Sequence, residues 1–180
     1  MKTYEDRQYY VAMFVSRNKD NDMVEGFKQR SRAFLTQKTP GELLVDFKEF
    51  YERGVPNETC RFYISVNARK YSVIYKALQH QLIDQMNLNL TNIEKLIASL
   101  SMKNGTALTN KWLFDFDDDK SLFKEFISDL STEIDGEILK IETPNGYAAV
   151  VEHGFDTREL LKKWSNVELK RDAMLFVTRE

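Results

Sequence analysis

The second half of the chain constrains the fold most, because its predicted secondary-structure elements follow in an order that few small folds share. Aromatic and β-branched residues favour strands, apolar residues spaced three or four apart favour a helix, and Asn-Gly marks a tight turn. These signals predict strands over 111–117, 137–142 and 147–152, helices over 120–130 and through Trp164, and a final strand or bent strand pair over 168–177. The resulting β-α-β-β-α-β order is that of the ferredoxin-like split unit, in which two helices cover one face of an antiparallel sheet.

The first half of the chain predicts more helix than strand. The predicted elements are strands over 8–15 and 60–66 and helices over 23–35, 40–53, 71–86 and 91–100. We therefore expect an α+β protein that forms a single domain over 1–180. This domain would have a helix-rich N-terminal lobe with two strands over 1–107 and the ferredoxin-like lobe over 108–180.

Composition excludes several functional classes. Lys and Arg number 26 and Asp and Glu number 28, and the formal net charge of −2 excludes a uniformly basic protein that coats DNA. No apolar run approaches the ~18 residues of a membrane helix, and the polar residues 1–6 do not resemble a secretory signal. Cys60, the only cysteine in the sequence, excludes an internal disulfide and a multi-cysteine zinc site. We expect a cytoplasmic protein with no membrane partner.

Two acidic residues interrupt the apolar strand over 111–117. Side chains alternate along a strand, so Asp115 and Asp117 face the side opposite to the aromatic residues, with Cα atoms roughly 7 Å apart. Carboxylates at this spacing suit one or two Mg²⁺ or Mn²⁺ ions, which bind phosphates and stabilise phosphoryl transfer. The alternatives are a cationic partner for Asp115 or a pair of solvated acids. Asp118 and Asp119 are expected to form the following turn and helix N-cap.

A third acid, Asp172, lies on the predicted last strand. In a ferredoxin-like sheet the first strand lies beside the third and the fourth strands, so Asp172 can meet the Asp115–Asp117 pair in space. The sequence therefore predicts Asp115, Asp117 and Asp172 as catalytic and metal-binding residues. The alternative for Asp172 is a surface ion pair with Lys170 or Arg171.

Two further segments are candidates for phosphate binding. Asn67, Arg69 and Lys70 lie between a predicted strand and a predicted helix, where cationic side chains and free backbone N–H groups can bind an anion. The alternative for them is a solvated strand end. Asn145 and Gly146 form a hairpin turn that can place N–H groups beside a phosphate, although an Asn-Gly pair also serves turns of purely structural role.

These segments, taken in order, resemble motifs of the archaeo-eukaryotic primase superfamily in its small phage- or plasmid-type primase-polymerase form. The similarity lies in RFYISVNARK at 61–70, WLFDFDDD at 112–119, TPNGYAAV at 143–150 and KRDAML at 170–175, and it covers roughly 60–177. The resemblance implies a helix-rich lobe joined to an RRM-like β-α-β-β-α-β catalytic lobe. Asp115 and Asp117 would form its first motif, and Asp172 its third.

The resemblance implies a metal-dependent nucleotidyltransferase that acts on nucleotides and on single-stranded or primer–template DNA or RNA during replication. Mg²⁺ or Mn²⁺ would be bound by the three acids. Phosphates would contact Asn67, Arg69, Lys70, Asn145, Gly146, Lys170 and Arg171. A phage-encoded chain of this kind would work in the host cytoplasm, with a replication protein or a host protein as a further partner.

One position departs from the family pattern. The family's second motif places a His after a Gly-containing turn, where it contacts the nucleotide phosphates, and this chain has Ala148 at that position. Lys170, Arg171 and His153 are candidates to replace it. The departure leaves a second interpretation open: a catalytically inactive relative that binds nucleic acid or a protein partner, as a phage accessory or host-inhibiting factor. A metal-dependent nuclease is a third.

Overall fold

The chain forms two compact units. The computed structural model describes residues 8–85 and 88–180, so the expectations for residues 1–6 and for Met86 lie outside the described part. Unit 1 is Met1–Leu108 together with Leu175–Glu180, and unit 2 is Thr109–Met174. Each unit is built on a four-stranded antiparallel sheet. The protein is therefore of the α+β class, as predicted.

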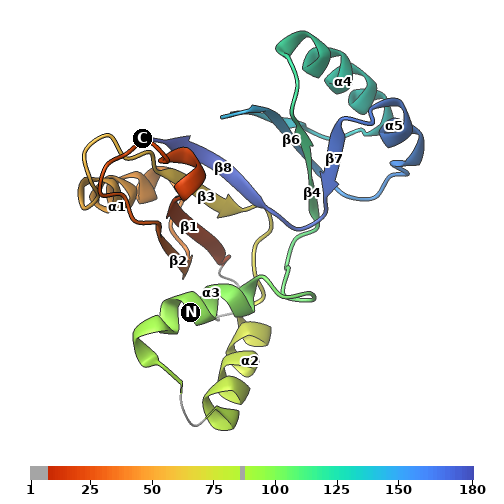
Figure 1. Ribbon diagram of the computed structural model, residues 1–180. Helices are drawn as coiled ribbons and strands as arrows, with labels where there is room; N and C mark the ends of the chain where they lie inside the picture. Colours follow the sequence, from red (N-terminus) through yellow and green to blue (C-terminus); the bar gives the residue numbers. More distant parts are fainter. Residues whose placement is uncertain (1–7, 86–87) are drawn as a thin grey trace. The chain divides into compact units, whose positions relative to one another are not determined.

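The sheet of unit 1 has the strand order β2-β1-β3-β8. Its strands are β1 (Tyr10–Ser16), β2 (Arg30–Thr36), β3 (Arg61–Ser65) and β8 (Met174–Arg179). Helix α1 (Pro40–Glu52) packs on one face of this sheet (Figure 1) and buries Phe47 against Phe14 and Phe62. Cys60 is fully buried in the same core, as expected for a small apolar residue.

Unit 1 is not the helix-rich lobe that the sequence predicted, because its N-terminal part consists of strands. The helix predicted over 23–35 is wrong: residues 21–26 form turns and bends, and Arg30–Thr36 form β2. Gly26 adopts a φ of 72°, a conformation that interrupts a helix. β2 pairs with β1 along its whole length. A complete set of main-chain hydrogen bonds to β1 outweighs the weak helical periodicity of this segment.

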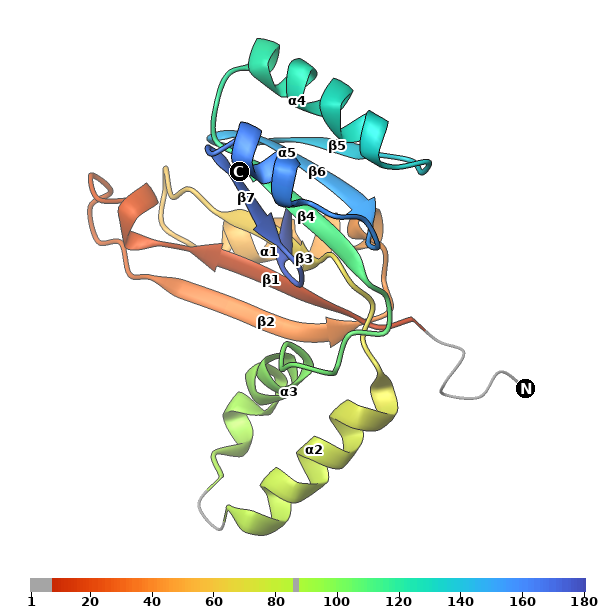
Figure 2. The ribbon, with the colours of Figure 1, turned by 90° about the vertical axis from the view of Figure 1, so that its right-hand side faces the viewer.

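Two helices lie between β3 and unit 2 in the sequence. The helix predicted over 71–86 is confirmed as α2 (Tyr71–Asp84), and α3 (Ile93–Ser101) follows the short 3-10 helix η3 (Leu90–Asn92). Another 3-10 helix, η2 (Asn18–Asp20), follows β1. α3 packs against α2 and against β2 (Figure 2). In the ranges 8–85 and 88–180, we find no helix with the length and apolar character that a membrane span requires.

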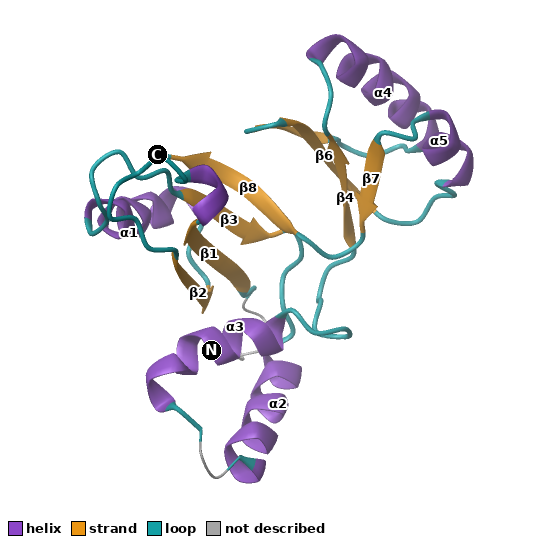
Figure 3. Cartoon of the chain, viewed as in Figure 1, coloured by secondary structure: helices purple, strands orange, loops and turns teal. Residues whose placement is uncertain are grey.

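Unit 2 shows the predicted β-α-β-β-α-β order. Its elements are β4 (Lys111–Phe116), α4 (Lys120–Glu133), β5 (Leu139–Thr143), β6 (Gly146–Glu152), α5 (Arg158–Lys163) and β7 (Val167–Lys170). The strand order in space is β5-β6-β4-β7, so β4 lies inside the sheet. Helices α4 and α5 lie on one face of the sheet (Figure 3). The opposite face of β4 is therefore the one that presents Asp115.

An aromatic core fixes which face of β4 lies under the helices. Phe114 and Phe116 are two residues apart on β4 and therefore point to the same face of the sheet. They pack against Phe123 and Phe126 of α4, with ring centroids 5.4 to 5.6 Å apart. Trp164, at the end of α5, belongs to the same buried cluster. Burying one large apolar side chain contributes about 1.5–3 kcal/mol. A one-residue slip of β4 would expose these rings and bury Asp115, so the register is strongly determined.

Candidate functional site

The candidate site of unit 2 lies at the C-terminal end of β4. β4 pairs with β6 and β7, and Asp115 lies opposite Ala148 on β6 and Glu168 on β7. Residues directly opposite one another in a sheet point to the same face. Asp115 and Glu168 therefore share the sheet face that α4 and α5 do not cover.

Lys170 is the charge partner of Asp115. Its Nζ lies 2.5 Å from Asp115 Oδ2 and 3.1 Å from Glu168 Oε2. Partial burial on its own lowers the pKa of Lys170, but the hydrogen bonds to Asp115 and Glu168 outweigh it, and the net effect is a raised pKa. Lys170 is therefore cationic at neutral pH. Of the alternatives open for Asp115 from the sequence, the structure shows a cationic partner.

The three acids that follow β4 have different environments. Asp119 is the N-cap of α4, and its carboxylate accepts hydrogen bonds of 2.7 and 3.0 Å from two backbone N–H groups of the first turn, which confirms the predicted cap. Asp118 accepts a hydrogen bond of 3.1 Å from the side-chain amide of Asn166. Asp117 is exposed to solvent. All three acids are exposed, and Asp117 is the one that directly follows β4, two residues after Asp115.

The β5–β6 hairpin brings its turn to the same end of β4. The turn has two residues, Pro144 and Asn145, which confirms the predicted tight turn. A Cβ atom on Gly146 would lie 2.2 Å from the carbonyl oxygen of Phe116 and 3.1 Å from the Cα of Asp117. Only glycine permits this approach. Gly146 therefore lies directly beside Asp117, so the structure brings together two residues that the sequence assigned to the site.

Asp172 is not brought to this end of β4. β7 runs antiparallel to β4 with Lys170 opposite Leu113, so the chain continues from Lys170 toward the N-terminal end of β4. Asp117, by contrast, follows the C-terminal end. Across residues 8–85 and 88–180, no three His, Cys, Asp or Glu side chains form a group that could hold a metal ion. Asp115 lies on β4 and Asp117 directly follows this strand, and metal binding stays a prediction.

Asn67, Arg69 and Lys70 belong to unit 1, between β3 and α2. Asn67 and Arg69 have relative exposures of 1% and 0%, whereas Lys70 is exposed. The backbone N–H groups of Arg69 and Lys70 donate hydrogen bonds of 2.7 Å to the carbonyls of Tyr9 and Thr106. The prediction that these residues join a strand to a helix is right, but Asn67 and Arg69 are not part of a solvated strand end.

Sequence reasoning missed Glu168 and Asn166 as partners of the acidic residues. Glu168 and Lys170 are two apart on β7, a spacing that places both on one face, but only the pairing of β7 with β4 shows that this face is that of Asp115. Arg171, predicted as a phosphate ligand, has its guanidinium 5.7 Å from the ring centroid of Trp112, within cation–π distance.

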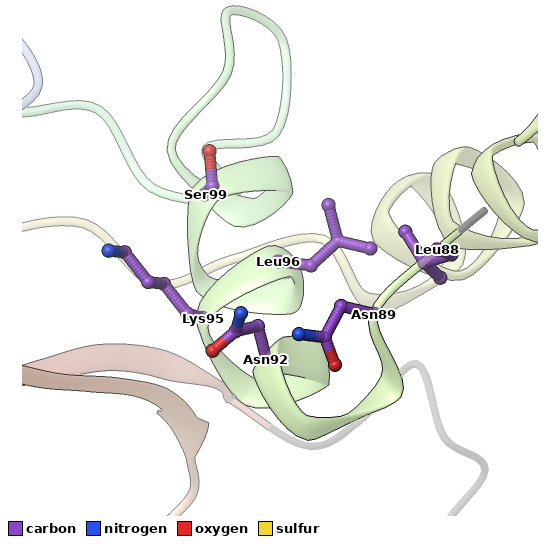
Figure 4. A pocket seen from close by; sticks show the side chains of 6 residues that line it. All are labelled: Leu88, Asn89, Asn92, Lys95, Leu96 and Ser99. Atoms are coloured by element: carbon purple, nitrogen blue, oxygen red, sulfur yellow. The ribbon is translucent and has the colours of Figure 1, made fainter.

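A depression of about 320 Å³ lies on α3 and the segment before it (Figure 4). Its lining residues are Leu88, Asn89, Asn92, Lys95, Leu96 and Ser99. None of them is a predicted site residue, and none is a carboxylate. This depression therefore does not suit a metal ion with bound phosphates.

The end of β4 thus combines an exposed carboxylate, a lysine-paired carboxylate and a tight glycine turn. Carboxylate oxygens with neighbouring cationic and backbone donors can bind a divalent cation together with phosphates, or serve as a polar surface for a partner. No model of a known protein family matches this chain, and neither the search of curated proteins nor the search of solved structures finds a match.

Proposed function

We propose that the chain is a primase-polymerase-like, metal-dependent nucleotidyltransferase that acts on nucleotides and on single-stranded or primer–template DNA or RNA. The main support is the placement of Asp115 and Asp117 at the C-terminal end of an inner strand, beside the glycine turn at Gly146. The family resemblance assigns the same two acids to its first motif. Asp172 is left out of the proposed metal site because it follows Lys170 toward the other end of β4.

The topology of unit 2 supports the family resemblance. The sheet order β5-β6-β4-β7, with both helices on one face, is that of the ferredoxin-like or RRM-like split unit. Ala148 lies directly opposite Asp115. A His at position 148 would therefore lie beside the acid that the resemblance assigns to the first motif.

The residues at the end of β4 fit a Mg²⁺ or Mn²⁺ ion that is bound partly by substrate. Mg²⁺ commonly uses one or two protein carboxylates and completes its coordination with water and substrate phosphates, so Asp115 and Asp117 suffice. The ion would stabilise the departing pyrophosphate as a Lewis acid. Lys170, whose Nζ contacts Asp115 and Glu168, would hold positive charge beside the bound phosphates.

Other phosphate contacts are proposed from the resemblance. In unit 2 they are the turn residues Asn145 and Gly146 and, after β7, Arg171. Asn67, Arg69 and Lys70 of unit 1 are left out, because Asn67 and Arg69 are buried and the backbone N–H groups of Arg69 and Lys70 already donate to main-chain carbonyls.

Nucleotide incorporation tests the proposed activity. The purified full chain is supplied with Mn²⁺, all four nucleoside triphosphates and either a primed or an unprimed single-stranded template, and products are separated by length. We expect the wild-type chain to extend the primer or template-bound product. The extension rate should fall at least about 100-fold in Asp115→Asn and in Asp117→Asn, because each substitution removes a charged metal ligand. Asp135→Asn, an exposed acid elsewhere in unit 2, is the matched control. No incorporation by a folded wild-type chain would overturn the proposal.

A second candidate function is favoured by two observations at the same site. Ala148 replaces the expected His, and Lys170 already neutralises Asp115. Both suit a non-catalytic relative that binds nucleic acid or a protein partner as a phage accessory or host-inhibiting factor. Titration calorimetry with Mg²⁺, nucleotides and single-stranded DNA separates the two functions. DNA binding that Asp115→Asn and Asp117→Asn leave unchanged, together with no nucleotide binding, favours this second candidate.

A further inference from the structure

Three tyrosine rings form a continuous stack in unit 1. The ring centroids of Tyr9 and Tyr71 are 5.0 Å apart with 26° between the planes, and those of Tyr71 and Tyr75 are 6.1 Å apart with 15° between the planes. Tyr71 and Tyr75 are one turn apart on α2. Tyr75, the last ring of the stack, is 50% exposed. The stack therefore ends in an aromatic ring that solvent reaches.

The backbone under this stack is held in place by hydrogen bonds. Arg69 N–H donates to the Tyr9 carbonyl, and Lys70 N–H donates to the Thr106 carbonyl, each over 2.7 Å. Arg69 and Lys70 directly precede α2, which begins at Tyr71. Tyr9 and the start of α2 are thus fixed relative to each other within unit 1. A ring supported in this way loses little conformational entropy when a ligand stacks on it.

The sequence around Tyr71 and Tyr75 is basic although the chain as a whole is slightly acidic. No Asp or Glu occurs from Thr59 to Ile83, in a chain with 28 acidic residues among 180. Lys70 and Lys76 flank Tyr71 and Tyr75 and are exposed. The first acid on α2 is Asp84, at its last residue. The field of this segment therefore favours an anionic partner.

We propose that Tyr75, stacked on Tyr71 and Tyr9 and flanked by Lys70 and Lys76, is a binding surface for single-stranded nucleic acid. A base would stack on the Tyr75 ring while the lysines contact the adjoining phosphates, the combination that single-strand binding proteins use. A duplex hides its base faces within the stack of base pairs, so the surface selects single strands. This inference goes beyond the carboxylate site at β4 and requires neither a metal ion nor Asp115.

Fluorescence anisotropy with a labelled oligothymidine of about 15 nucleotides tests the surface in the full chain. EDTA is present and nucleotides are absent, so nucleotidyl transfer plays no part. We expect Tyr75→Ala to weaken binding by about 5-fold or more, the effect of losing one stacked base, whereas Tyr75→Phe keeps the aromatic face and binds like wild type. Leu139→Ala, which removes a side chain of similar exposure (51%) in unit 2, should leave the affinity unchanged.

The salt dependence tests the role of the lysines. For single strands the slope of log K against log salt changes by about 0.7 for each phosphate contact, so Lys70→Gln combined with Lys76→Gln should reduce it by about 1.4. Lys162→Gln on α5, which removes an exposed lysine from unit 2, is the charge-matched control and should leave the slope unchanged.

Several outcomes would overturn the inference. The first is equal affinity for single strands and for duplex. The second is wild-type affinity in a Tyr75→Ala variant whose circular dichroism spectrum is unchanged. The third is displacement of the oligonucleotide by a proline-rich peptide that binds Tyr75 more tightly. Absence of oligonucleotide binding overturns it as well, and leaves the proposal for Asp115 and Asp117 to its own incorporation assay. Failure of incorporation with oligonucleotide binding intact overturns only the catalytic proposal.

Discussion

At the scale of single residues, Gly146 shows how closely two strands approach at the candidate site. The atom that a Cβ would meet at 2.2 Å is a backbone oxygen, that of Phe116. A backbone oxygen cannot rotate away as the end of a side chain can. Any side chain at Gly146 must therefore push β6 away from β4 next to Asp117. The Asn-Gly pair predicted the turn, but the requirement for glycine at this position comes from β4, which is distant in sequence.

We expect Gly146→Ala to lower the free energy of unfolding of unit 2 by about 1–3 kcal/mol, the usual cost of inserting atoms into a packed site. Urea denaturation followed by tryptophan fluorescence measures this, because both tryptophans of the sequence, Trp112 and Trp164, lie in unit 2. Gly136→Ala is the matched control, since a Cβ there has no atom within 4 Å. An unchanged midpoint for Gly146→Ala would show that the strands do not approach as closely as described.

At the scale of elements, Asp129 links α4 to the end of α5. Its Oδ2 accepts a hydrogen bond of 2.7 Å from the indole N–H of Trp164, and Lys163 Nζ lies 2.6 Å from the same oxygen. The hydrogen bonds from Lys163 and Trp164 lower the pKa of Asp129. The helix over 120–130 was predicted from its apolar face. The contact with Trp164 involves Asp129, a polar residue outside that apolar face. It could therefore be assigned only from the packing of the two helices.

We expect the Asp129 carboxylate to make the stability of unit 2 depend on pH. A carboxylate with a lowered folded-state pKa contributes stability that is complete above its ordinary pKa and is lost as the pH falls through the folded-state value. Asp129→Asn keeps an acceptor for the indole but not the charge. The variant should be less stable than wild type at about pH 7, and the difference should shrink as the pH falls below the ordinary pKa of an aspartate side chain.

Urea denaturation followed by tryptophan fluorescence at a series of pH values measures this difference. Asp135→Asn, an exposed acid in the same unit, should show no comparable change with pH. A stability difference between wild type and Asp129→Asn that is the same at every pH would contradict the role given to the charge.

At the scale of the whole molecule, the chain leaves unit 1 after Leu108 and returns to it at Leu175. β8 completes the sheet of unit 1 beside β3, where Cys60 and Glu180 exchange backbone hydrogen bonds of 2.9 and 3.1 Å. Leu175 and Val177 of β8 pack against the core of that unit. Unit 2 is thus one continuous segment, whereas unit 1 needs both ends of the sequence.

Deleting residues 175–180 should therefore destabilise unit 1 more than unit 2. The deletion removes the main-chain partner of β3 and apolar area whose loss costs about 2 kcal/mol or more. Hydrogen exchange of the β3 amides should become faster, while the unfolding midpoint reported by Trp112 and Trp164 changes less. Unchanged protection of β3 in the shortened chain would show that β8 does not support this sheet.

The sequence by itself determined the order of elements in unit 2, the two-residue hairpin turn and the N-cap at Asp119. Each of these depends on residues close together in the chain: the alternation along β4, the apolar spacing along α4, and the turn residues Pro144 and Asn145 before Gly146. Local periodicity and turn chemistry are properties of short segments. These features can therefore be predicted without knowledge of what packs against the segments.

Only the tertiary structure decided the features that depend on pairing between distant segments. β2 is a strand because β1 offers it a full set of hydrogen bonds, and β8 belongs to unit 1 because β3 has an open edge there. In the same way, the register of β7 places Lys170 rather than Asp172 beside Asp115. Registers and partners arise from contacts that form only when the chain folds, so no local pattern in the sequence specifies them.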